Sequence, residues 1–347
     1  MIEKAALVRF FFVLMLSLYK HSDMNGTINI FVELGRRLRL FGKDEHTKMV
    51  LANAVAENEW FAEQDVYRAI DAICEEYLDE EKLTRWAAHY PTPSQPRKVA
   101  IVMAGNIPLV GFFDMMCVVL CGYKAYVKPS SKDSVLTNYI IAELKDISKD
   151  IHIEEYNPTD NYDMIIATGG AEAAKHFSRQ YSSIPALIRG SRHSVAILTG
   201  KESDEELQGL QRDIFTYNGL GCRNVSLVFL PRGAELNIPA PTMNPMYHGN
   251  YLHNKAMRQM MGEAFRDMGE YILVEERNFS SNISQINYCF YDAIEQVEQW
   301  FAENDEQIQC VVANITNHPR RVAFGRAQYP TLWDYADGVD VMRFLTE

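Results

Sequence analysis

The N-terminal part of the chain has the hydrophobic spacing of α-helices. From residue 24 to about residue 89, stretches such as "INIFVELGRRLRLF" and "VYRAIDAICEEYLDEEKLTRWAAHY" place apolar side chains three and four positions apart. The proline-rich stretch "PTPSQPRK" then interrupts this spacing. We therefore predict a helical N-terminal region over residues 24–95.

Short apolar runs alternate with helical stretches over residues 96–201. "VAIVMAG", "KAYVKP", "YDMIIATGG" and "HSVAILTG" are typical of strands buried on both faces, and the segments between the first three have helical spacing. This βαβ alternation predicts an α/β fold with a parallel sheet. It favours a Rossmann-type dinucleotide-binding domain over residues 96–201, although the usual GxGxxG motif is absent.

A second, smaller α/β unit is predicted from residue 202 to the C-terminus at 347. "SDEELQGLQRDIFTYNG" has helical spacing, with Ser203 as its N-cap. The strand-like run "NVSLVFLP", a helix around "NKAMRQMMGEAFRDMG" and the strand-like runs "ISQINYCFY" and "IQCVVANI" follow it. No internal repeat or low-complexity tract accompanies them.

The apolar extension over residues 1–23 has three interpretations. "AALVRFFFVLMLSLY" contains Arg9, is short for a membrane span and precedes no small-residue cleavage site. It is a product of a start codon wrongly assigned ahead of Met24, an additional packed helix, or a signal or anchor. We expect no stable membrane insertion.

Composition and charge narrow the class of protein. A chain of 347 residues with 47% hydrophobic content is long enough for one large or two medium domains. Its net charge of −12 argues against a nucleic-acid partner. The six scattered cysteines are expected to be reduced thiols of a cytoplasmic protein. Cys117 and Cys121 lie in a wholly apolar run, so we expect no metal site there.

Two stretches carry candidate binding groups at the ends of predicted strands, where open α/β sheets bind their ligands. "AYVKPSSKDS" offers Lys128, Ser130, Ser131 and Lys132 as donors to a ribose or a phosphate, or it is a solvated loop. "IATGGAEAAKHF" places two glycines, at 169 and 170, before a helix whose free N–H groups favour a phosphate. A tight strand–helix turn explains Gly169 and Gly170 equally well.

The remaining candidates are catalytic. Asn106 in "MAGNIPLVGF" is either a turn residue or an amide donor to an oxyanion. His193, in "IRGSRHSVAIL", is a surface histidine or a general base. Cys222, in "NGLGCRNVS", is flanked by glycines and by Arg223, which is unlike a core thiol. A neighbouring guanidinium lowers a thiol pKa, so Cys222 is a candidate nucleophile.

Five segments, taken in their order along the chain, resemble the motif series of the aldehyde dehydrogenase superfamily. They are "GNIPL", "VKPSSKD", "ATGGAEAAK", "IRGSRHSVAIL" and "GLGCRNVS". The C-terminal "FGRAQYPTLWDYADGVDVM" resembles the ending of its acyl-CoA reductase branch, the fatty-acid reductase type of bioluminescence. The resemblance implies that Cys222 is the nucleophile and that Asn106, with the Cys222 N–H, holds the thioester oxygen. It also implies that Lys128 binds the adenosine ribose and that Gly169–Gly170 form the turn beneath the pyrophosphate.

Departures from the family pattern refine this interpretation. Ser131 replaces a glutamate that repels a 2′-phosphate, and Lys132 is adjacent, so NADPH is favoured over NADH. Ile188 stands where hydrolytic members have the glutamate that activates water. Its absence favours release of the acyl group by hydride rather than by water. Only about 125 residues follow Cys222 (347 − 222), and the family's E-I-F-G-P motif, which holds the nicotinamide ribose, has no clear counterpart. The resemblance therefore does not establish the family's substrate funnel or oligomerisation arm here.

The hypothesis is an NADPH-dependent reductase that converts an acyl-CoA to an aldehyde through an acyl-enzyme on Cys222. Arg223 and His193 are expected to favour the thiolate or to protonate the leaving group. The resemblance also implies a homo-oligomer. Two alternatives stay open: an inactive or interaction subunit with the same fold, and a reductase whose donor is an acyl carrier protein or an acyl phosphate.

Overall fold

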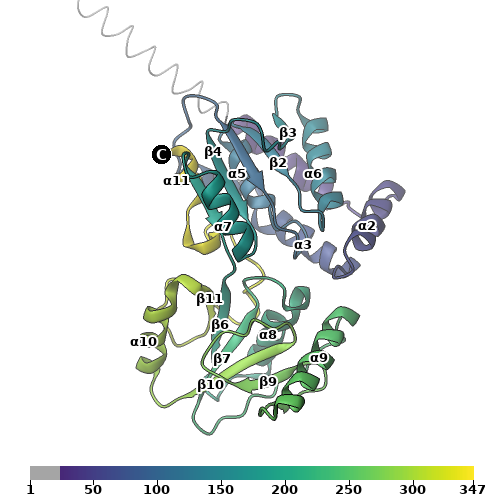
Figure 1. Ribbon diagram of the computed structural model, residues 1–347. Helices are drawn as coiled ribbons and strands as arrows, with labels where there is room; N and C mark the ends of the chain where they lie inside the picture. The colour runs from purple at the N-terminus through teal and green to yellow at the C-terminus, as the bar shows by residue number, and fades with distance from the viewer. Residues whose placement is uncertain (1–23) are drawn as a thin grey trace, which may run out of the picture.

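The computed structural model describes residues 24–347, which form two lobes, each built on its own β-sheet (Figure 1). The three interpretations of residues 1–23 lie outside the described residues. Across residues 24–347, no helix is both long enough and apolar enough to cross a bilayer.

The helical N-terminal region is confirmed. A helix over 24–38 is followed by α2 (Glu45–Glu57), α3 (Glu63–Glu76) and α4 (Glu80–Ala87). Side chains of Asp44 and Asp79 cap α2 and α4. Buried residues of these helices, including Phe31, Leu34 and Trp86, belong to the same hydrophobic core as one face of the first sheet.

The first sheet is parallel throughout, with strand order β3-β2-β1-β4-β5. Its strands are β1 (Lys98–Val102), β2 (Lys124–Lys128), β3 (Ile153–Glu155), β4 (Met164–Thr168) and β5 (Ala186–Arg189). Helices α5 (Phe112–Leu120) and α6 (Ser134–Ile147) share the core of one face, and α7 (Ala171–Gln180) packs on the other. Because the chain runs outward from β1 to β3 and then returns to β4, a topological switch point lies at the carboxyl ends of β1 and β4.

The second sheet has the order β12-β11-β6-β7-β10-β9-β8 and is parallel except for the β8–β9 pair. Its strands are β6 (His193–Ile197), β7 (Val225–Pro231), β8 (Arg266–Asp267), β9 (Ile272–Glu275), β10 (Gln285–Tyr291), β11 (Ile308–Val312) and β12 (Arg321–Val322). The helices of this lobe are α8 (Asp204–Phe215), α9 (Pro245–Met261) and α10 (Ile294–Asn304) (Figure 1).

Two segments lie in a different lobe from the one that the sequence predicts. Strand β6, grouped above with the dinucleotide domain, pairs with β7 and β11 of the second sheet, so the sheets divide between Arg189 and His193. The C-terminal helix α11 (Val341–Thr346) returns to the first lobe and buries Val341, Met342 and Leu345 in its core. A continuous apolar run predicts a buried strand, but it carries no information about which strands pair with it.

Helix α8 ends four residues earlier than its hydrophobic spacing predicts. Ser203 caps it as expected, in a reciprocal capping box with Glu206. The chain then leaves the helix in a 3₁₀ turn, η1 (Thr216–Gly219), where Tyr217 and Asn218 have φ angles of 54° and 55°. These left-handed conformations stop the helix and lead the chain into the loop that carries Cys222.

Candidate active site

A cleft of about 1000 Å³ lies between the two lobes. It is bounded by the carboxyl ends of β1, β2 and β4 and by the amino ends of β6, β7 and β10. The structure brings together here every candidate residue of the sequence analysis except Arg223, namely Asn106, Lys128, Ser130, Ser131, Lys132, Gly169, Gly170, His193 and Cys222. Residues up to 116 positions apart in the chain (222 − 106) thus share one site.

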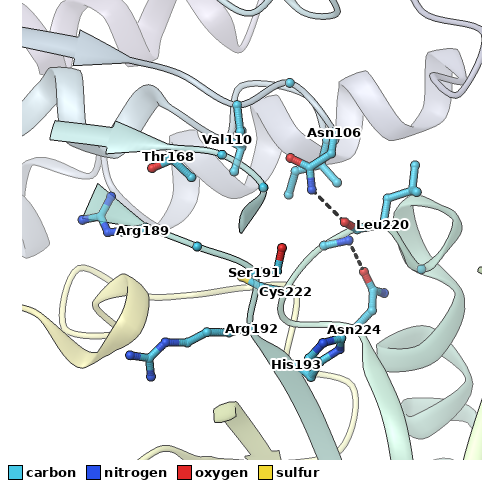
Figure 2. A pocket seen from close by; sticks show the side chains of 18 of the residues that line it. Asn106, Val110, Thr168, Arg189, Ser191, Arg192, His193, Leu220, Cys222 and Asn224 are labelled. Carbon is cyan, nitrogen blue, oxygen red and sulfur yellow. Dashed lines mark hydrogen bonds between the residues drawn. The ribbon is translucent and has the colours of Figure 1, made fainter. Parts of the chain in front are cut away.

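Cys222 lies half-buried on the short loop between η1 and β7 (Figure 2). Its carbonyl accepts a hydrogen bond of 2.9 Å from the Ser194 hydroxyl at the start of β6. The other five cysteines are buried. Cys222 is therefore the most accessible of the six thiols, and it is also the one that lines the cleft.

The Asn224 side chain fixes the conformation of this loop. Its Nδ2 donates to the carbonyls of Asp213, Ile214 and Thr216 at 3.2, 3.1 and 2.9 Å, where α8 ends. Its Oδ1 accepts from the Gly221 N–H at 2.8 Å. One buried amide thus ties the residue before Cys222 to the end of α8. The sequence pattern does not single out Asn224, because an asparagine after a glycine-rich turn is an ordinary loop residue.

Burial raises the pKa of the Cys222 thiol above its ordinary value. The guanidinium of Arg223 opposes this rise, Asp337 adds to it, and Arg189 opposes it. The Arg223 side chain donates to the Asp334 carbonyl at 2.8 Å and is not among the cleft-lining residues. The charge of Arg223 thus favours the thiolate, but desolvation of the thiol outweighs it.

Asn106 reaches across the cleft toward the cysteine loop. Its Nδ2 donates to the Leu220 carbonyl at 2.7 Å, two residues before Cys222 (Figure 2). The same nitrogen carries a second hydrogen, so the amide retains one donor. Its segment is fixed by Asp133, whose Oδ2 accepts from the Leu109 N–H at 2.7 Å. Burial raises the pKa of Asp133 to about 8.

His193 begins β6 and lines the cleft. Its ring stacks on Phe279 at a centroid distance of 4.8 Å, and Nδ1 lies 3.4 Å from the Ser226 hydroxyl oxygen. Burial lowers the pKa of His193, so the imidazole is neutral at pH 7. A neutral imidazole can accept a proton, so this state suits a general base better than a group that protonates the leaving group.

The switch point of the first sheet fits the phosphates of a dinucleotide. Gly170 is the N-cap of α7, makes no side-chain cap, and has no heavy atom within 4 Å of the place where a Cβ would stand. The first turn of α7 thus lies at the cleft without a capping side chain, with the positive end of the helix dipole. Lys128 ends β2, which β1 separates from β4 in the sheet, and its ammonium lies 6.0 Å from the Tyr156 ring centroid. Lys128 and the Gly169–Gly170 turn line the same cleft.

The end of β5 carries no carboxylate beside the thiol. Ile188 is partly buried against the aromatic cluster on the α7 side of the sheet. The next residue, Arg189, lines the cleft and pairs with Asp114 at 2.5 Å. Within residues 24–347, no group of three or more His, Cys, Asp and Glu side chains is arranged to hold a metal ion.

The C-terminal segment "FGRAQ" (residues 324–328) packs against α8, the helix that precedes the cysteine loop. Buried Asp213 accepts the N–H groups of Gly325 and Ala327 at 2.6 and 3.0 Å. Burial raises the pKa of Asp213 to about 7. Gly209 allows this approach, because a Cβ there would lie 2.8 Å from the Phe324 carbonyl carbon. The "FGRAQ" stretch is thus a structural support for the helix that precedes the cysteine loop.

A parallel sheet and a mostly parallel sheet, flanking a cleft with a cysteine on one wall, make up an aldehyde-dehydrogenase-like fold. The chain is similar to an acetylating aldehyde dehydrogenase from Geobacillus thermoglucosidasius, with a TM-score of 0.63 and 12% identity over 93% of this chain and 90% of that one. It is also similar to the glyceraldehyde-3-phosphate dehydrogenase GapN of Methanocaldococcus jannaschii, solved with NADP, with a TM-score of 0.59 and 12% identity over 85% and 82%. At these identities the likeness shows the fold, as the sequence predicts.

The particular family follows from the sequence match. The family model for acyl-CoA reductase (LuxC) matches residues 45–239, more than half of the chain, and the chain therefore belongs to this family. A curated relative, the long-chain acyl-protein thioester reductase of Aliivibrio fischeri, is 27% identical over 156 residues. That match spans 39% of this chain and only 32% of the relative.

Proposed function

We propose that this protein reduces an acyl thioester to an aldehyde through an acyl-enzyme on Cys222, with NADPH as reductant. The observation that carries the proposal is that Cys222 shares one cleft with the open N-terminus of α7 at the switch point. On this account residues 96–192 form the dinucleotide-binding domain, and the lobe built on β6–β12 presents the nucleophile.

The chemistry of the first half-reaction follows from the cysteine loop. The Cys222 thiol loses its proton, and its sulfur forms a bond to the thioester carbonyl carbon. The resulting oxyanion accepts hydrogen bonds from the Cys222 N–H and from the free donor of the Asn106 amide. A donor placed in this way contributes about 3 kcal/mol. The carbon–sulfur bond to CoA then breaks, CoA leaves as a thiolate that takes up the proton, and the acyl group remains on Cys222.

In the second half-reaction the acyl group leaves Cys222 as an aldehyde. A bound nicotinamide dinucleotide supplies the hydride when it is present. The α7 N-terminus would hold its phosphates and Lys128 its ribose, and the oxyanion donors would act a second time. Cys222 regains a thiolate, so the cycle consumes one thioester, one NADPH and one proton and yields aldehyde, CoA and NADP⁺. Ile188, in place of a carboxylate, leaves water without a general base at that position.

The preference for NADPH rests on Ser131 and Lys132, both of which line the cleft near Lys128. A serine does not repel a 2′-phosphate, and the ammonium of Lys132 attracts it. A second candidate donor is an acyl group carried on a protein, since the relative from Aliivibrio fischeri is named for an acyl-protein thioester. The two donors are separated by comparing CoA and carrier-protein thioesters of the same acid.

The direct test is NADPH oxidation with acyl-CoA as the only acceptor. Cys222→Ala is expected to abolish the activity, because it removes the nucleophile without a large change in volume. Cys289→Ala, at a buried thiol on β10 remote from the loop, is the matched control and should retain turnover. Full activity in Cys222→Ala would overturn the proposal. Absence of acyl-CoA-dependent turnover in the wild-type chain, with and without residues 1–23, would favour an interaction subunit.

A further inference from the structure

The loop between α2 and α3 contacts both lobes, and we call its residues 58–60 the interlobe bridge. On the side of the first lobe, the buried Asn58 donates through Nδ2 to the Gly105 carbonyl at 3.3 Å and to the Lys132 carbonyl at 3.1 Å. Gly105 directly precedes Asn106, and Lys132 is one of the candidate cofactor residues that line the cleft. One amide thus joins the loop of the candidate oxyanion donor to the loop of the candidate cofactor groups.

The second lobe holds the same three residues. The Trp60 carbonyl accepts from Asn218 Nδ2 at 3.1 Å. The Glu59 carbonyl accepts from Asn244 Nδ2 at 2.8 Å. The Trp60 side chain packs, partly buried, against the core of the second lobe. Since Asn218 lies in η1, four residues before Cys222 (222 − 218), the bridge connects the first-lobe loops to the turn that leads into the cysteine loop.

Each of the three asparagines that hold the bridge uses both ends of its amide. The Oδ1 of Asn58 accepts the Trp60 N–H at 3.1 Å. That of Asn244 accepts the Met246 N–H at 2.8 Å, and that of Asn218 accepts the Asn244 N–H at 3.4 Å. The Nδ2 atoms supply the bonds of the bridge. An ionised aspartate has nearly the same shape but no donor, so Asn→Asp removes a bridge bond and keeps the local acceptor.

We propose that the interlobe bridge sets the position of the Asn106 amide relative to the Cys222 sulfur. On this account the three asparagines that hold the bridge are positioning residues for acyl transfer. This inference rests on the proposed function, and it adds the helical N-terminal region to the parts of the chain that determine the rate. Asn106 is exposed at the cleft, so its position depends on the backbone that carries it. The bridge holds that backbone at Gly105, and a displacement of about 1 Å can slow a catalysed step about 100-fold.

The first test compares two reactions of Cys222 in the variants Asn218→Asp and Asn244→Asp. Acylation is measured as CoA release, without cofactor, from an acyl-CoA that supports NADPH oxidation, and alkylation is measured with iodoacetamide. Only acylation uses the Asn106 amide, whereas a change in the thiolate fraction alters both rates alike. The ratio of the acylation rate to the alkylation rate should therefore fall about tenfold in each variant.

The same variants in an Asn106→Ala background test whether the bridge acts through that amide. There each substitution should lower the ratio by no more than about twofold, because effects on one shared interaction are not additive. The matched control is Asn304→Asp, which removes a donor to the Trp300 carbonyl on α10 and should leave the ratio unchanged. A wild-type ratio in both single variants would overturn the proposal, as would an undiminished tenfold loss in the Asn106→Ala background.

Amide hydrogen exchange tests the bridge without any turnover. Asn244→Asp lies in the second lobe, yet it should speed exchange over residues 103–109 of the first lobe, because the bridge links the two. Asn58→Asp should speed exchange there and over residues 214–222. If Asn58→Asp does not fold, Asn244→Asp carries the test, since its carboxylate still caps α9.

The two measurements keep the bridge separate from the reductase. Faster exchange over residues 103–109 in Asn244→Asp, without acylation of the wild type, would support the bridge and overturn the reductase. Unchanged exchange together with a wild-type ratio of acylation to alkylation would overturn the bridge and leave the reductase standing. Unchanged exchange together with no acylation of the wild type would overturn both.

Discussion

At the residue scale, Asn224 determines where the Cys222 thiol sits. Asn224→Ala removes the hydrogen bonds to three carbonyls and to the Gly221 N–H and leaves these groups buried. We expect the free energy of unfolding to fall by about 2–3 kcal/mol. We also expect kcat to fall by about 100-fold while KM changes little, because the nucleophile is misplaced. Denaturant titration and steady-state kinetics measure the two effects.

The matched control is Asn250→Ala on α9, where the amide donates to the Met246 carbonyl within the helix. It should leave both kcat and stability nearly unchanged. If Asn224→Ala lowered stability but left kcat at the wild-type value, Asn224 would be a purely structural residue.

The pKa of Cys222 predicts a pH profile. Burial raises the thiol pKa, so the thiolate is populated only at higher pH than in a free cysteine. The rate of alkylation by iodoacetamide should therefore rise with pH and reach half its maximum above about pH 8.5, the ordinary value. Arg223→Gln removes a cation that lowers this pKa and should shift the profile further toward alkaline pH. A midpoint below about pH 8.5 would contradict the burial argument.

The sequence identifies the reactive atoms of the candidate site better than the groups that hold them. Cys222 and Asn106 stand out because a thiol after two glycines and an amide just after a strand are chemically unusual. Asn224, Asp213 and Arg189 do not stand out, since their roles depend on backbone groups and charges that come near only in the folded chain. The buried ion pair of Arg189, for example, is with Asp114, 75 positions away in the chain.

At the scale of elements, close packing of the C-terminal "FGRAQ" stretch against α8 stabilises that helix. Gly209→Ala would place a methyl group 2.8–2.9 Å from Phe324 and Gly325, forcing the segment away from α8. We expect a loss of about 1–3 kcal/mol in stability. We also expect slower turnover, because α8 leads directly into the cysteine loop. Thermal unfolding and acyl-CoA-dependent NADPH oxidation measure these changes.

Gly249→Ala in α9 is the matched helical glycine. No heavy atom lies within 4 Å of the position that the new methyl group would take, so the substitution should stabilise the protein by about 0.5–1 kcal/mol through helix propensity. If the two alanine variants changed stability in the same direction, close packing at Gly209 would not be the cause.

Secondary-structure elements are easier to predict from this sequence than their pairing. The spacing of apolar residues predicts the N-terminal helices and the central strands β1, β2, β4 and β7. This spacing is informative because a buried face of a helix or strand requires apolar side chains at regular intervals. It places β6 in the wrong sheet and extends α8 to Gly219. Sheet membership depends on contacts with β11, more than 100 residues later, and the helix ends through the left-handed conformations of Tyr217 and Asn218.

At the scale of the whole molecule, the cleft lies between the lobe proposed to bind the cofactor and the lobe that carries Cys222, so we expect that cofactor choice can be changed without touching the thiol. Ser131→Glu introduces a carboxylate that repels a 2′-phosphate and accepts from ribose hydroxyls. We expect the ratio of kcat/KM for NADPH to that for NADH to fall at least tenfold. The rate of Cys222 alkylation should stay at the wild-type value. An unchanged ratio would show that Ser131 and Lys132 do not face the ribose.

The central claim is that Cys222 receives an acyl group and transfers it to hydride. The most direct measurement is single-turnover mass spectrometry of the protein mixed, in the absence of cofactor, with an acyl-CoA that supports NADPH oxidation. We predict release of one equivalent of CoA, a mass increase of one acyl group located on Cys222, and loss of that mass as aldehyde when NADPH is added. Acylation at another cysteine, no acylation at all, or discharge as free acid would contradict the claim.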